Sequence, residues 1–158
     1  MPVKLRVKQK RNNQKFMELL AMNKQKIEVG TVTDYAIKNF NAFGLSHVLD
    51  SGSSRGVPGW NYNEKALEDF RERGRTLFLK GVNGIVKGGW SVSAMTNQIG
   101  IEAAARYKAK IESIKSPPNA PSTIARKGFN NPMIETGRFK ANIAARINGG
   151  RVVGRGLG

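Results

Sequence analysis

Residues 91–114 read SVSAMTNQIGIEAAARYKAKIESI, and this stretch decides the fold. Its apolar side chains recur at spacings of three and four, which is the period of one helix face. Ser91 or Ser93 can cap the helix start, because a serine hydroxyl accepts from backbone N–H groups of the first turn. We therefore expect one long helix through Lys115, with a continuous apolar face of Met95, Ile99, Ala103, Tyr107, Ile111 and Ile114.

A second long helix is expected just before it, from the N-cap Asn63 to about Val86. Gly74 and Gly81 lie on or beside its apolar stripe, and each costs up to about 1 kcal/mol relative to Ala, so we expect close packing there. The break at Gly88-Gly89 predicts that the two helices pack as an antiparallel pair. The stripe consists of Leu67, Phe70, Leu77, Phe78, Val82 and Ile85.

Strand patterns lie at the two ends of the chain. Residues 2–10 alternate apolar and basic side chains, and residues 26–33 are rich in β-branched residues. A short helix is expected between them, at 13–23. Residues 142–147 suit either a helix or a strand, and Gly149-Gly150 predicts a hairpin into a short strand at 151–153. The fold class expected is α+β: a small antiparallel sheet packed against two long helices, with extended N-terminal, loop and C-terminal arms.

The chain is expected to form a single domain over residues 1–158. Gly, Ser and Pro predict a flexible loop region at 34–62. Prolines end the second long helix and indicate a semi-rigid Pro-rich spacer at 116–135, which would carry the C-terminal element away from the helices. Single helical turns are expected inside it near Ser122 and after it at Thr136. Residues 149–158 form the expected C-terminal hairpin and tail.

The net charge of +16 comes entirely from the two ends of the chain. Residues 1–26 carry eight Lys or Arg against one Glu, and residues 106–158 carry eleven against two Glu. The middle, 27–105, holds eight basic and eight acidic residues. Such ends attract polyanions, which could be DNA or an acidic protein surface, or they form a solvated surface. No run reaches the roughly 18 apolar residues of a membrane span, so no membrane partner is expected.

Residues able to carry chemistry are sparse. The single histidine, His47, precedes Asp50 at a spacing that could pair a base with a carboxylate, but the remaining acids offer no third ligand at a clustered spacing. The chain has no cysteine, no nucleophile elbow and no phosphate-binding loop. The acids Glu68, Asp69 and Glu72 alternate with basic residues and predict a salt-bridged helix face. We expect neither an enzyme nor a cofactor or metal.

Nucleic-acid motifs are also weak. Residues 94–106 faintly resemble a helix-turn-helix, but the apolar stripe continues through Gly100 without a turn signal, so one uninterrupted helix is expected. Aromatic residues make up 8% of the chain and do not alternate with the basic ends, which disfavours a stacking platform for single strands.

Residues 114–143 read IKSPPNAPSTIARKGFNNPMIETGRFKANI. This segment resembles the C-terminal region of tailed-bacteriophage tail-completion and virion-morphogenesis proteins, the neck proteins that join head to tail. That family carries Pro-Pro-Asn-x-Pro-x-Thr, then Lys-Gly, then Pro-Leu-Ile-Asp-Thr-Gly-x-Leu. Here Met133 stands for the first leucine of the last motif, Glu135 for the aspartate and Phe139 for the second leucine. Upstream, Asn41-Ala-Phe-Gly44 lacks the family's acidic residue.

The resemblance implies a structural virion protein that forms a ring, expected to be a hexamer, at the head–tail junction. Its partners would be the connector or head-closure protein on one side and the tail terminator or tube protein on the other, with packaged DNA in the channel as a further contact. It would reside in the virion neck, after assembly in the host cytoplasm. The candidate interface residues are Lys4, Arg6, Lys8, Arg126, Lys127, Thr136, Gly137, Arg138 and Phe139. The alternative is a basic DNA- or RNA-binding protein acting through its Lys/Arg-rich termini.

Overall fold

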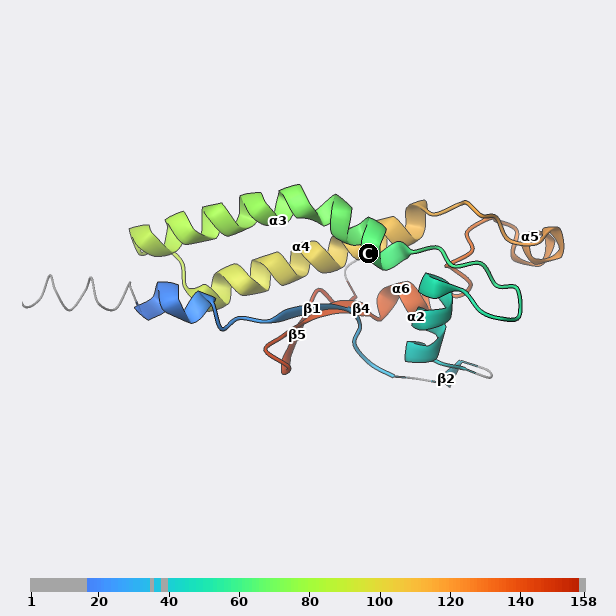
Figure 1. Cartoon of the computed structure of the whole chain (residues 1–158), viewed down its shortest axis with the longest axis horizontal. Helices are drawn as coiled ribbons and strands as arrows, with labels where there is room; N and C mark the ends of the chain where they lie inside the picture. Colours follow the sequence, from blue (N-terminus) through green and yellow to red (C-terminus); the bar gives the residue numbers. More distant parts are fainter. Residues whose placement is uncertain (1–16, 35, 38–39, 157–158) are drawn as a thin grey trace, which may run out of the picture.

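A computed structural model describes residues 17–34, 36–37 and 40–156. Its longest elements are helices α3 (Tyr62–Lys87) and α4 (Val92–Ser113). They lie side by side as an antiparallel pair, and α4 lies between α3 and a small sheet (Figure 1). The expected α+β architecture is confirmed, and α4 runs without interruption through residues 94–106.

The sheet has three antiparallel strands in the order β1-β4-β5, namely β1 (Ile27–Thr31), β4 (Ile143–Ile147) and β5 (Arg151–Val153). Residues 143–147 therefore form a strand, which resolves the two options left by the sequence, and the hairpin into β5 is confirmed. Ile27 pairs with Ile147 and Thr31 with Ile143. The strand expected at 2–10 lies outside the described residues. Of the short helix expected at 13–23, residues 17–22 are helical and the start also lies outside.

Glycines set how closely α4 approaches its two neighbours. A Cβ added at Gly100 would lie 3.1 Å from Ala145 Cβ and 3.0 Å from Val153 Cγ2, so the glycine lets α4 pack directly on the sheet. On the other side, a Cβ at Gly81 of α3 would lie 2.3 Å from Met95 Cγ. The close packing predicted at Gly81 is confirmed, and it explains why a glycine is tolerated inside the helix.

The apolar stripe predicted for α3 is partly wrong. Leu77 and Ile85 are buried, but Phe78 is 44% exposed and Leu67 is 52% exposed. The line of α3 that is buried also contains small residues, such as Ala66 and Gly81, which allow the two helix backbones to approach. The periodic pattern predicted burial from the positions of large apolar side chains, whereas the helices pack closely along a line that also contains small residues.

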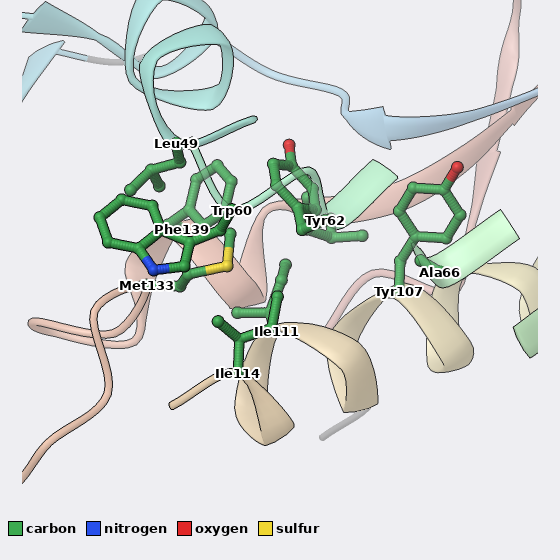
Figure 2. Close-up of a cluster of buried hydrophobic side chains, with 10 residues drawn as sticks. Leu49, Trp60, Tyr62, Ala66, Tyr107, Ile111, Ile114, Met133 and Phe139 are labelled. Carbon is green, nitrogen blue, oxygen red and sulfur yellow. The ribbon is translucent and has the colours of Figure 1, made fainter. Parts of the chain in front are cut away.

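The main core cluster joins the ends of α3 and α4 to segments distant in sequence (Figure 2). Tyr62 meets Phe139 edge-to-face, with ring centroids 5.8 Å apart. The Tyr62 hydroxyl also shares a 2.6 Å hydrogen bond with Ser46 Oγ. The cluster consists of Leu49, Trp60, Tyr62, Ala66, Tyr107, Ile111, Ile114, Met133, Phe139 and Ile143.

The prediction of a flexible loop region at 34–62 is partly wrong, because these residues include helix α2 (Ala42–Ser51). The strands β2 (Ala36–Ile37) and β3 (Phe40–Asn41) precede this helix as a small antiparallel pair. Asn41 caps α2 through its side chain, which accepts from the Gly44 N–H at 2.7 Å. The helix forms because Leu49 enters the core, a long-range contact that local composition does not reveal. Among the described residues, the longest part of this region without helix or strand is 52–61, and it contains the buried Trp60.

The cap predicted for α3 is also corrected. Asn63 lies inside the helix, and the N-cap residue is Asn61, whose side chain makes no capping hydrogen bond. Instead, the carboxylate of Asp50 accepts from the Asn63 N–H at 3.0 Å. The cap therefore comes from the end of α2. The predicted cap of α4 is confirmed, since Ser91 Oγ accepts from the Ala94 N–H at 3.1 Å.

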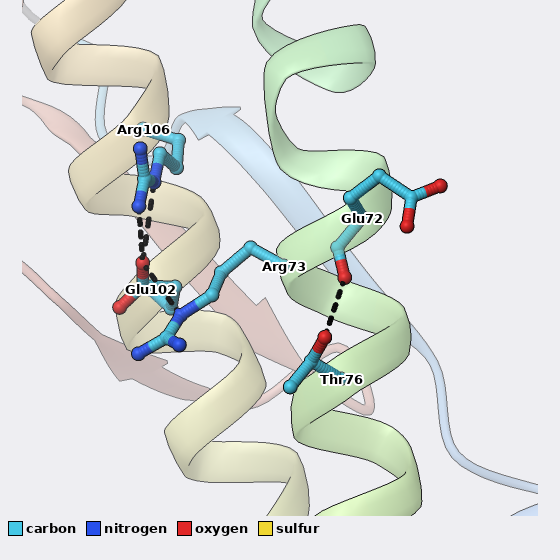
Figure 3. A network of polar contacts seen from close by, with 5 residues as sticks. All are labelled: Glu72, Arg73, Thr76, Glu102 and Arg106. Atoms are coloured by element: carbon cyan, nitrogen blue, oxygen red, sulfur yellow. Dashed lines mark hydrogen bonds and ion pairs between the residues drawn. The ribbon is translucent and has the colours of Figure 1, made fainter.

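The charged residues of α3 form ion pairs mainly across to α4. Arg73 Nε lies 3.4 Å from Glu102 Oε1, and Arg106 contacts the same carboxylate at 3.2 Å (Figure 3). Lys110 pairs with Asp69 at 2.6 Å. Of the acids predicted to form a salt-bridged face on α3, Asp69 forms an ion pair, but its partner is Lys110 of α4. This pair and the Arg73–Glu102 pair join the two helices, whereas the Arg106–Glu102 pair lies within α4.

Candidate interaction surface

The segment that carries the family resemblance forms a protruding lobe, here called the C-terminal lobe and comprising residues 116–137. It contains helix α5 (Pro121–Lys127), which lies beyond the ends of α3 and α4 (Figure 1). None of the residues of α5 is buried. The side chains of α5 are exposed or half-buried, so this helix presents surface that a partner could contact.

The prediction that this segment is a spacer carrying the C-terminal element away from the helices is wrong. After α5 the chain returns, and Met133 is buried in the core cluster. Helix α6 (Arg138–Ala141) and strand β4 then follow directly against α4. The return was not foreseen because prolines predict extended chain locally and give no information on where the chain goes next.

Asn131 anchors the lobe to the end of α4. Its side-chain Nδ2 donates to the carbonyls of Glu112 at 2.9 Å and Ile111 at 3.3 Å, and its Oδ1 accepts from the Met133 N–H at 2.9 Å. The last carbonyls of a helix lack partners within the helix, so this amide supplies what the end of α4 needs. Asn131 is only 3% exposed, which makes these bonds costly to lose.

Two further hydrogen bonds hold the base of the lobe. Asn130 Oδ1 accepts from the Asn119 N–H at 3.1 Å, which joins the two sides of the lobe. Trp60 Nε1 donates to the Pro117 carbonyl at 2.9 Å, which joins the lobe to the loop before α3. Hydrogen bonds at the base therefore hold the lobe in place, while helix α5 makes few contacts with the other helices and strands.

The outer part of the lobe is basic and contains an aromatic ring. Arg126 pairs with Glu135 at 2.8 Å. Lys127 Nζ donates to the Asn131 carbonyl at 2.7 Å and lies 4.8 Å from the centroid of Phe129, a cation–π contact. Burial lowers the pKa of Lys127, an effect that the nearby Glu135 opposes. Phe129 itself is 43% exposed.

A pocket of about 310 Å³ lies between the lobe and α2. Leu45, Leu49, Met133 and Phe139 give it an apolar floor, while Glu135 and Arg138 contribute charge. Apolar pockets with a few polar groups commonly receive a ligand or a partner side chain.

The structure brings the candidate residues of the C-terminal half together. Arg126 and Lys127 lie on α5, and Thr136, Gly137 and Arg138 line the pocket. The Thr136 hydroxyl accepts from the Arg138 N–H at 3.5 Å, a long contact, and Gly137 is the N-cap residue of α6.

Phe139 is 6% exposed and packs on Tyr62 in the core, and its side chain also lines the pocket. Lys4, Arg6 and Lys8 lie outside the described residues.

Lys108 was missed by sequence reasoning. This lysine of α4 is 4% exposed, and its Nζ donates to the Gly154 carbonyl at 2.8 Å. Burial lowers its pKa. The bond ties the chain after β5 to α4. A lysine beside the apolar stripe gives no sequence signal of burial, because its partner is a backbone carbonyl far along the chain.

The structure places both His47 and Asp50 on helix α2. His47 is exposed on α2, and the carboxylate of Asp50 caps α3. Over residues 17–34, 36–37 and 40–156, no group of three or more His, Asp or Glu side chains could hold a metal ion. Within the same ranges, no helix combines the length and apolar character needed to cross a bilayer.

Comparison with known proteins found no matching family model, no matching curated protein and no matching solved structure.

Proposed function

We propose that this chain is a structural subunit of the head–tail junction of a tailed bacteriophage, where it assembles into a ring between the connector and the tail. The observation that carries the proposal is residues 114–143, whose sequence resembles neck and tail-completion proteins. In the structure these residues include the anchored C-terminal lobe, with its exposed helix α5.

The form of the lobe supports a role in subunit contact. A heterologous ring needs one surface that projects and a different surface that receives it. The lobe projects beyond the long helices (Figure 1), and the pocket between the lobe and α2 is concave and apolar. We propose that the lobe of one subunit contacts the next subunit around the ring, while faces above and below the ring contact the connector and the tail.

The purified full-length chain tests the proposal by light scattering after size exclusion and by negative-stain microscopy. Closed rings are expected, and their attachment to tails or connectors would assign the position. Phe129→Ser should weaken the assembly of subunits into a ring, because the aromatic side chain of Phe129 is exposed on the lobe. Phe43→Ser is the matched control, since Phe43 is similarly exposed, at 48%, but lies on α2. Monomers at all concentrations would contradict the proposal.

The alternative, a DNA- or RNA-binding protein, has one observation in its favour. The segment 106–158 has eleven basic residues against two acidic ones. Under that alternative the chain remains monomeric and binds duplex DNA with an affinity that falls steeply as salt is raised. The same preparation, titrated with DNA at two salt concentrations, separates the two functions.

A further inference from the structure

One edge of the sheet is open in the described part of the chain. Strand β1 pairs only with β4 there, and the pairing fixes which backbone groups are used. The Asn148 N–H donates to the Lys26 carbonyl and the Val32 N–H donates to the Asn142 carbonyl. Because hydrogen-bonded pairs alternate along an antiparallel ladder, Glu28 and Gly30 also bond toward β4.

The residues of β1 that alternate with Glu28 and Gly30 point their backbone N–H and C=O groups away from β4. Ile27, Val29 and Thr31 direct their N–H and C=O groups to the open edge, where no backbone partner is found among the described residues. Such a row of unpaired groups is a template for another strand, and proteins usually cover it or block it. Neither proline nor lysine lies within β1 to block it.

The two faces of β1 differ, so they specify what kind of strand would fit. Val29 is opposite Ala145 and therefore shares the face that α4 covers, whereas Glu28 is opposite Arg146 on the other face. A strand added beside β1 would need apolar side chains toward α4 and would meet Glu28 on the other face. Glu28 already pairs with Lys26 at 2.8 Å, and a basic side chain on the added strand would share this exposed carboxylate.

The sequence of residues 2–10 meets both needs. Val3, Leu5 and Val7 alternate with the three basic residues of the candidate list, Lys4, Arg6 and Lys8. We propose that this segment of one subunit pairs with the open edge of β1 in a neighbouring copy, so that each sheet in the ring is completed by the next chain. The inference deepens the proposed ring and rests on it.

The path of the chain favours a second copy as the occupant. The helical residues 17–22 lie near the end of the molecule where α3 and α4 are joined, and their C-terminal end leads into β1 (Figure 1). The N-terminal end of this helix therefore points away from the sheet (Figure 1). Pairing with its own β1 would require the chain to turn back along the helix, whereas a neighbour's edge can be reached by continuing outward.

Because the chain has no cysteine, engineered disulfides can test the pairing without background. Glu28→Cys is co-expressed with Lys4→Cys, Arg6→Cys or Lys8→Cys on a second chain of different mass. At least one combination should give a disulfide between the two chains upon oxidation. Arg75→Cys, on α3, replaces Glu28→Cys as the matched control and should give none. The oligomeric state of each mixture is measured in parallel.

A second measurement does not depend on the substituted side chains. In the assembled full-length chain, the amide of Val29 should be protected from hydrogen exchange, and deletion of residues 2–10 should reduce this protection roughly tenfold or more. The amides of Glu28 and Gly30 serve as internal controls, because they bond to β4 with or without the added strand.

The outcomes are distinct. A disulfide between chains, with loss of protection only at the outward amides, supports the inference. Rings without that disulfide overturn the inference and leave the ring proposal standing. Monomers overturn both.

Discussion

Replacing Asn131 with alanine should destabilise the protein, because its buried side chain makes three hydrogen bonds at the end of α4 and the base of the lobe. The substitution removes a donor to two carbonyls at the end of α4 and an acceptor for the Met133 N–H. Leaving a buried polar group unpaired costs about 1–3 kcal/mol. With one buried N–H and one partly buried carbonyl affected most, we expect a loss of about 3 kcal/mol in the free energy of unfolding. For a chain of this size that corresponds to a fall of roughly 6–12 °C in Tm.

The neighbouring Asn130 provides the matched control. It makes the same types of bond, to the Asn119 N–H and the Lys115 carbonyl, but at a more exposed place. Asn130→Ala should therefore cost less than about 1 kcal/mol. Both variants are compared with the parent chain by thermal and urea unfolding. If Asn131→Ala and Asn130→Ala melt together, the amide of Asn131 does not anchor the lobe in the way we describe.

Three other perturbations follow from the packing and the pKa directions. Burial raises the pKa of Tyr62 to about 12, against about 10 in the unfolded chain. The free energy of unfolding should therefore decrease as the pH rises from 10 toward 12. Tyr62→Phe removes the titrating hydroxyl, so over this pH range the variant should lose about 3 kcal/mol less than the parent chain. Gly81→Val should lower the free energy of unfolding by about 1–3 kcal/mol, because its Cβ would overlap Met95, and an unchanged urea midpoint would count against the close helix contact. Asp50→Ala should cost about 1 kcal/mol through the lost α3 cap, whereas His47→Ala should leave the melting curve unchanged; equal effects would refute the capping role.

The long helices and the C-terminal hairpin could be predicted because their signals are local. A repeat of three and four identified α4, Ser91 marked its start, and Gly149-Gly150 marked the turn before β5. These patterns depend on neighbours within a few residues, so the sequence contains them explicitly.

The missed features depend on contacts between distant residues. Phe78 satisfies the helical period, yet it is exposed because α4 packs on the line of α3 that contains Gly81. The capping role of Asp50, the amide bonds of Asn131 and the buried Lys108 all involve polar groups whose partners lie on other elements. The burial of Phe139 against Tyr62 was likewise not predicted, because a motif identifies a position without stating which way its side chain points.

The pairing of β1 with β4 has a consequence for the order of events during synthesis. The first of these strands leaves the ribosome long before the second, since Ile27 pairs with Ile147 near the end of the chain. The α3–α4 hairpin can form in the meantime, but the side of α4 around Gly100 stays uncovered until the last strands emerge. Chains halted after residue 142 should therefore remain aggregation-prone intermediates, with both β1 and this face of α4 exposed to other nascent chains.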